Sequence, residues 1–199
     1  MSKIALSLVM IASVGAIVIG ATGAYFSDTE ASVGNTFTAG TLDLNIEGDN
    51  VNTIMFTVAD LAPGSSGFGK VVLDNVGNMD GFLDISFLNL ISDDMLCNDP
   101  ESDVDSTCSD AEGELLENLD VLACIDDGDD ICGGAGDTEV YNGKANLMGI
   151  DELADYALTK GSSVVFRLEW SIDSSVGNII QSDTAGFDIE FELAQTAGQ

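Results

Sequence analysis

Apolar and polar residues alternate with period two over several stretches of this chain, and no other feature constrains its fold as strongly. The clearest stretch is residues 162–172, where apolar side chains fall on one face of an extended strand and Val165, Arg167 and Glu169 on the other. The apolar face consists of Val164, Phe166, Leu168 and Trp170. Alternation of this kind is typical of a strand with one buried and one exposed face.

Shorter alternating stretches recur along the chain, separated by turn-forming residues such as Pro63-Gly64. They predict strands at residues 41–47, 54–58, 71–75, 82–90, 141–147 and 187–193. Short strands at this spacing favour an all-β fold, a jelly-roll-like antiparallel β-sandwich with one or two short helices in its connections.

Two segments carry helical features. Four leucines in residues 114–122 have helical spacing, which predicts either a helix there or a turn or two of helix followed by a strand at 121–125. Residues 151–156 predict one helical turn, with Asp151 as its N-cap.

The first 24 residues predict a secretory signal peptide. Lys3 precedes an almost wholly apolar run at residues 4–19, and a small-residue stretch then ends at Ala24. We expect a signal peptidase to cleave after Ala24 during export, so that the chain is secreted and contacts the membrane only through the uncleaved signal. The alternative is a retained membrane anchor, although no basic stop-transfer cluster follows the apolar run.

Export makes the four cysteines interpretable as two disulfides, because an even count in an exported chain favours bridges over metal. Cys97 and Cys108 lie in an acidic insertion at residues 92–113; Cys124 precedes a second insertion at 126–137, and Cys132 lies within it. Pairing within each insertion, 97–108 and 124–132, is the simplest connectivity; pairing between the insertions is the alternative.

The chain is strongly acidic, with 35 Asp and Glu against 5 Lys and Arg and a formal charge of −30. This excludes nucleic acid as a partner, because its phosphates would be repelled. Divalent cations would be attracted, and the weak Ca²⁺ candidates Asp126, Asp127, Asp129 and Asp130 surround Gly128. Their spacing does not match an EF-hand loop, and a solvated acidic loop without any cofactor is the alternative.

No catalytic residue can be assigned. The chain contains no histidine, so it lacks the imidazole ligands of a zinc peptidase and the usual base of a serine or cysteine nucleophile. We therefore expect the protein not to be an enzyme.

The segment after the predicted cleavage site, residues 25–38, has apolar residues spaced along a polar strand: Tyr25, Phe26, Val33 and Phe37. In an extended conformation Tyr25, Thr29, Ala31, Val33 and Phe37 share one face. A disordered arm, or an ordinary edge strand paired within its own domain, would explain the same pattern.

Several motifs of the chain resemble the TasA/camelysin family of secreted fibre proteins. They are YFSDTE at 25–30, GNTFTAGTLDL at 34–44, LAPG at 61–64, NVGNMDG at 75–81, LEW at 168–170, NIIQ at 178–181 and FDIEFELAQ at 187–195. The two acidic insertions depart from the family's usual middle.

The resemblance implies a jelly-roll domain at residues 39–199 that polymerises into extracellular filaments, either biofilm-matrix fibres or bundling pili. Related archaeal pilins assemble by donor-strand exchange, which implies that residues 25–38 enter the next identical subunit, head to tail. The donor residues would be Tyr25, Phe26, Thr29, Ala31, Val33 and Phe37. Two alternatives are a secreted acidic Ca²⁺-binding surface module and a camelysin-like metallo-endopeptidase.

Overall fold

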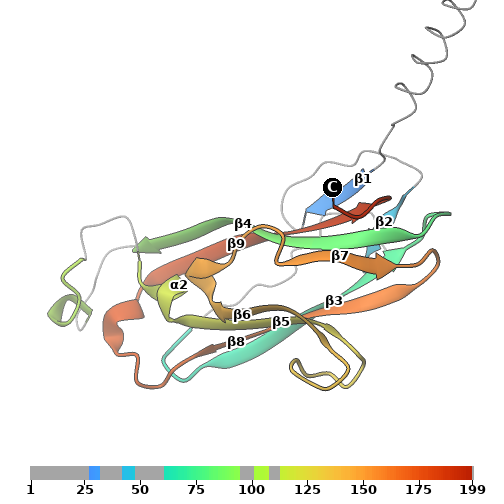
Figure 1. Ribbon diagram of the computed structural model, residues 1–199. Coiled ribbons are helices and arrows are strands. Elements are labelled where there is room, and N and C mark those ends of the chain that lie inside the picture. The colour runs from blue at the N-terminus through green and yellow to red at the C-terminus, as the bar shows by residue number, and fades with distance from the viewer. Residues whose placement is uncertain (1–26, 32–41, 48–60, 95–100, 108–112, 199) are drawn as a thin grey trace, which may run out of the picture.

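Two antiparallel sheets form the protein. A computed structural model describes residues 27–31, 42–47, 61–94, 101–107 and 113–198, and the sheets lie in it as two stacked layers (Figure 1). The four-stranded sheet has the order β1 (Ser27–Ala31), β9 (Asp183–Ala194), β4 (Gly81–Asp94) and β7 (Leu153–Leu158). The five-stranded sheet has the order β2 (Leu44–Ile46), β3 (Ser66–Asn75), β8 (Ser163–Ile172), β5 (Leu119–Asp126) and β6 (Thr138–Lys144). The predicted all-β sandwich is confirmed.

Short helical segments occupy the connections, as expected. They are α2 (Leu115–Asn118) and the 3₁₀ turns η1 (Glu101–Asp103), η2 (Ala145–Leu147) and η3 (Asn178–Ile180). Of the two readings of residues 114–122, the short helix followed by a strand is the right one, because α2 leads directly into β5. None of the helices in the described ranges is long and apolar enough to cross a lipid bilayer.

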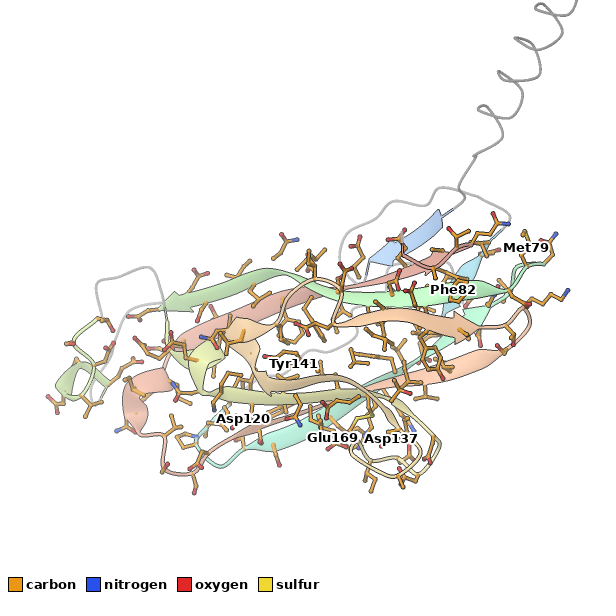
Figure 2. All side chains as sticks on the ribbon, viewed as in Figure 1. Met79, Phe82, Asp120, Asp137, Tyr141 and Glu169 are labelled. Carbon is orange, nitrogen blue, oxygen red and sulfur yellow. A yellow bond between two sulfur atoms is a disulfide. The ribbon has the colours of Figure 1, made fainter. Side chains whose placement is uncertain are left out.

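The alternating residues of the two sheets meet in one core. Phe166 of β8 and Phe191 of β9 are both fully buried, and their rings make an edge-to-face contact with centroids 5.2 Å apart. Phe87 of β4 makes a similar contact with Tyr141 of β6, which lies between the layers in Figure 2. These aromatic pairs join the sheets, and each stabilises the contact by about 1 kcal/mol beyond its burial.

The helical turn expected at residues 151–156 is wrong, because this segment contains most of strand β7. β7 pairs with β4, with Leu158 opposite Gly81 and Tyr156 opposite Leu83. Asp155 adopts a positive φ of 59° within the strand, and its N–H donates to the carboxylate of Asp84. Pairing with a long neighbouring strand has outweighed the local helical preference.

The other predicted strands differ mainly in length. The strands predicted at 71–75 and 82–90 belong to the longer β3 and β4, and β4 continues to Asp94, inside the first predicted insertion. The strand predicted at 141–147 begins earlier, as β6, and ends in η2. The strand predicted at 54–58 lies outside the described residues.

Candidate functional site

The predicted donor segment contributes the edge strand of the four-stranded sheet. β1 pairs antiparallel with β9 of the same chain, from Ser27 opposite Ala194 to Ala31 opposite Glu190. The single chain therefore has β1 as an edge strand paired within its own domain, which is one of the alternatives that the sequence pattern allows. Thr29 and Ala31 lie in this strand. The other predicted donor residues lie outside the described ranges: Tyr25, Phe26, Val33 and Phe37.

The register of β1 is unusual for its sequence. Directly opposed residues of an antiparallel ladder share a face of the sheet. Asp28 is opposite Leu193 and Glu30 is opposite Phe191, and both β9 residues are fully buried. The same-chain register thus places two acidic positions opposite buried residues of β9 and Ala31 opposite Glu190, whereas the apolar pattern favours Ala31 at a core-facing position. A slip of one residue would exchange the two faces.

β9 offers a longer edge than β1 covers. It has 12 residues and pairs with β4 from Asp183 to Ala194 on one side. On the other side β1 pairs with residues 190–194, and no described strand pairs with residues 183–189. We call this side of β9 the acceptor edge. Unpaired N–H and C=O groups on such an edge are available to another strand.

Residues 126–137, the disulfide loop, form the second candidate region. The predicted Cys124–Cys132 bridge is confirmed, whereas Cys97 and Cys108 lie outside the described residues. The loop folds back on the outer face of the five-stranded sheet, where the N–H of Cys132 donates to Glu169 Oε1 at 3.1 Å. In Figure 2, Glu169 and Asp137 lie on this same side of the sandwich.

Four carboxylates gather in the disulfide loop, each with an oxygen within 4.8 Å of the others: Asp126, Asp127, Asp129 and Asp137. Asp130, predicted as a member, instead forms an ion pair with Lys70, whose ammonium lowers the pKa of Asp130. Asp137 was missed because only the return of the chain after Cys132 brings it back to Asp127, whose N–H it accepts at 3.0 Å. The set consists of oxygen donors alone.

Arg167, predicted on an outer face, is only 4% exposed. Its Nε lies 2.7 Å from Glu169 Oε1, and its guanidinium carbon lies 3.9 Å from the centre of the Phe68 ring. The cysteine bridge covers it, because Cys124 lies opposite Arg167 in the ladder. A pocket of about 420 Å³ adjoins these side chains and is also lined by Trp170 and Asn142. The alternation predicted the face correctly but could not show that the loop covers it.

Comparison with known proteins places the chain in a family. The sequence profile described as camelysin metallo-endopeptidase matches residues 1–199. The chain belongs to the camelysin family. The family predicted from the motifs is therefore confirmed. No curated protein matches this camelysin-family chain.

The family's description implies a catalytic metal, and the donors of this camelysin-family chain do not fit a zinc peptidase. Catalytic zinc in peptidases is held by imidazoles, and the chain has no histidine. Cys124 and Cys132 are consumed in a disulfide. Among the residues that the structure describes, the gathered donors are carboxylates, which suit Ca²⁺ or Mg²⁺. We therefore assign no catalytic step to a metal here.

Proposed function

We propose that this chain is a structural subunit of an extracellular filament, in which residues 25–38 of one subunit add to β9 of the next. The observation that carries the proposal is the acceptor edge: β1 pairs with only residues 190–194 of the 12-residue β9. The same short pairing sets two acidic positions of β1, Asp28 and Glu30, opposite the buried Leu193 and Phe191. As the edge strand of its own chain, β1 is thus short, and its acidic positions are poorly matched to the buried residues of β9 that they oppose.

A strand from a neighbour would correct both features. If its register is shifted by one residue, Tyr25, Ala31, Val33 and Phe37 fall on the core-facing side and the acidic residues on the outer side. Residues 25–38 are also long enough to pair with the whole of β9. Main-chain hydrogen bonds would supply affinity and the apolar side chains the register. Exchange of the home strand for an identical one costs few contacts, and a head-to-tail contact that does not close produces a filament.

In this proposal the leader at residues 1–24 is removed on export, and the uncleaved leader keeps the strand at the membrane so that processing precedes assembly. The partners are identical subunits, and no cofactor is needed for the strand exchange itself. The fibre is either a biofilm-matrix fibre or a bundling pilus. Camelysin-type peptidase activity has no part in it, and a fluorogenic peptide assay on filament-free protein should give no turnover above buffer.

The first test removes the donor strand. Mature protein beginning at Tyr25 and a variant lacking residues 25–33 are compared by electron microscopy at rising concentration. We expect filaments from the first and a folded monomer from the second, with circular dichroism as the check on folding. Filaments from the shortened protein would refute the proposal.

A second test uses cysteine pairs, because opposed residues of a ladder are close enough for a disulfide. Thr29 lies opposite Glu192 in the same chain. The double variant T29C/E192C should hold β1 at home and abolish assembly until reductant is added, with wild-type protein in the same reductant as the control. When single variants are mixed, E192C should form covalent dimers with D28C or with E30C, because a shift of the register by one residue brings position 28 or 30 opposite Glu192. Full assembly by oxidised T29C/E192C, with its bridge verified by mass spectrometry, would refute strand exchange.

A further inference from the structure

Three carboxylates, one fully buried and two half-buried, lie where the first acidic insertion meets the beginning of β9, at the end of the sandwich that holds α2 in Figure 1. Glu101, in η1, is fully buried. Its Oε2 accepts a hydrogen bond from the hydroxyl of Ser182 at 2.5 Å. Its Oε1 is buried as well, and no donor from the described residues reaches it. A half-satisfied, fully buried carboxylate is unusual, because an unpaired buried charge is costly.

Asp183, the first residue of β9, likewise has one buried carboxylate oxygen without a hydrogen-bond donor among the described residues. Its Oδ2 accepts the N–H groups of Glu114 at 2.6 Å and Leu115 at 2.9 Å, where α2 begins. Its Oδ1 is buried and receives no bond from any described donor. The carboxyl group is pressed against the backbone at Gly113, since a Cβ there would lie 2.8 Å from Asp183 Cγ.

Glu114 is the third member of the group. Its Oε1 accepts from the hydroxyl of Thr107 at 2.8 Å, and its Oε2 is buried with no described donor. We call Glu101, Glu114 and Asp183 the buried acid group. Three segments distant in sequence each bring one carboxylate oxygen without a hydrogen-bond donor to the same end of the fold.

Among the residues that the structure describes, no lysine or arginine forms an ion pair with this group. No lysine or arginine occurs between Lys70 and Lys144. The three ion pairs of the described residues involve other acids. The pKa of Asp183 is raised to about 6, chiefly by burial and also by the negative charges of Glu114 and Glu101, against the backbone hydrogen bonds from Glu114 and Leu115, which lower it. The carboxylates therefore repel one another and require a counter-charge from outside the chain.

We propose that the buried acid group is a binding site for a divalent cation, Ca²⁺ in preference to Mg²⁺. Ca²⁺ takes carboxylate oxygens in flexible geometry, which suits ligands from three separate segments, whereas Mg²⁺ demands a stricter octahedron and retains its waters. Within the described ranges, a set of three or more acidic residues with oxygens all within 4.8 Å of one another occurs only in the disulfide loop. The oxygens of the buried acid group must therefore move together around the ion, which would join η1, α2 and β9.

The test compares Ca²⁺ and Mg²⁺ titrations of EDTA-treated mature protein, followed by calorimetry and by thermal unfolding. The variant E101Q/D183N keeps acceptors for Ser182, Glu114 and Leu115 and removes two charges. Two variants serve as matched controls: E117Q removes an exposed acid of α2, and D129N/D137N removes half of the disulfide-loop cluster.

We expect Ca²⁺ to raise the Tm of the wild type and of both controls. In E101Q/D183N the affinity should fall at least tenfold and the Tm response should disappear, while the Tm in EDTA rises above that of the wild type because repulsion is relieved. The single variant E101Q should show the same pattern in weaker form. An unchanged Ca²⁺ response in E101Q/D183N would overturn the proposal. So would a wild type that is insensitive to Ca²⁺ but stabilised by lowering the pH to 5, since a proton would then be the counter-charge.

Discussion

Substitution of Asn75 directly tests what stabilises the turn in the family motif NVGNMDG at residues 75–81. It is fully buried at the end of β3, and its side chain satisfies three groups. Nδ2 donates to the carbonyls of Met79 at 2.9 Å and Leu158 at 3.0 Å, and Oδ1 accepts the N–H of Gly77 at 3.1 Å. One amide thus joins the β3–β4 turn to the end of β7.

Replacement by alanine removes all three bonds. Each is worth about 1 kcal/mol net, and a buried carbonyl left without a donor costs about 1–3 kcal/mol. Because Leu158 is 1% exposed, water has little access to its carbonyl. We expect Asn75→Ala to lower the free energy of unfolding by about 3 kcal/mol, equivalent to a Tm loss of roughly 6–12 °C in a domain of this size.

Asn75→Asp refines the test, since it keeps the shape and the acceptor but replaces two donors with an oxygen facing two carbonyls. At pH 7 it should be less stable than Asn75→Ala. The gap should narrow as the pH falls and the carboxyl becomes protonated and able to donate. Chemical denaturation at pH 7 and pH 4 measures both variants. A loss below about 0.5 kcal/mol for Asn75→Ala would refute the reasoning, since that is the scatter expected of a surface substitution.

Three further outcomes are expected. Cys124→Ala with Cys132→Ala opens a loop of sequence separation 8 and should cost about 2.5 kcal/mol in urea unfolding, less if the reduced loop stays ordered. Asp84→Asn should raise the Tm at pH 7 but not at pH 3. Burial raises the pKa of Asp84, and so do the charges of Asp155 and Asp151, whereas the hydrogen bond from the Asp155 N–H lowers it. Because the net shift is upward, ionisation of Asp84 destabilises the folded state only above the ordinary pKa of an aspartate. Phe191→Ala should cost about 3–5 kcal/mol, because Phe191 is fully buried; equilibrium denaturation checks it.

The sequence predicted the strands of the core well because their burial is set by local alternation. Leu42, Leu44 and Ile46 are buried as expected, and so are Phe166 and Leu168 of β8. β7 was missed because its residues carry no alternation: its burial runs buried, exposed, exposed, intermediate, exposed, buried. What makes it a strand is the ladder with β4, whose paired residues are 68 to 77 positions earlier in the sequence, and no local pattern records such pairing.

The candidate sites were predicted less well for a related reason. The local bridge Cys124–Cys132 followed from spacing, but the exchange of Asp130 for Asp137 in the carboxylate cluster depends on how the loop returns. The buried acid group was not foreseen at all. Glu101 stands in a run of acidic and polar residues typical of a solvated loop, and only the packing of η1 beside η3 and β9 buries it.

The acidic composition has two separable consequences. On the surface, the acidic residues outnumber the basic ones and repel one another, and any salt that screens them should stabilise the fold gradually, without saturation at low concentration. In the buried acid group the repulsion is local, and screening by dissolved salt hardly reaches it. A specific ion there must act at one equivalent and saturate. Titration of Ca²⁺ in molar NaCl therefore separates general screening from specific binding. The NaCl already screens the surface charges, so any further stabilisation by Ca²⁺ comes from carboxylates that the bulk salt does not screen.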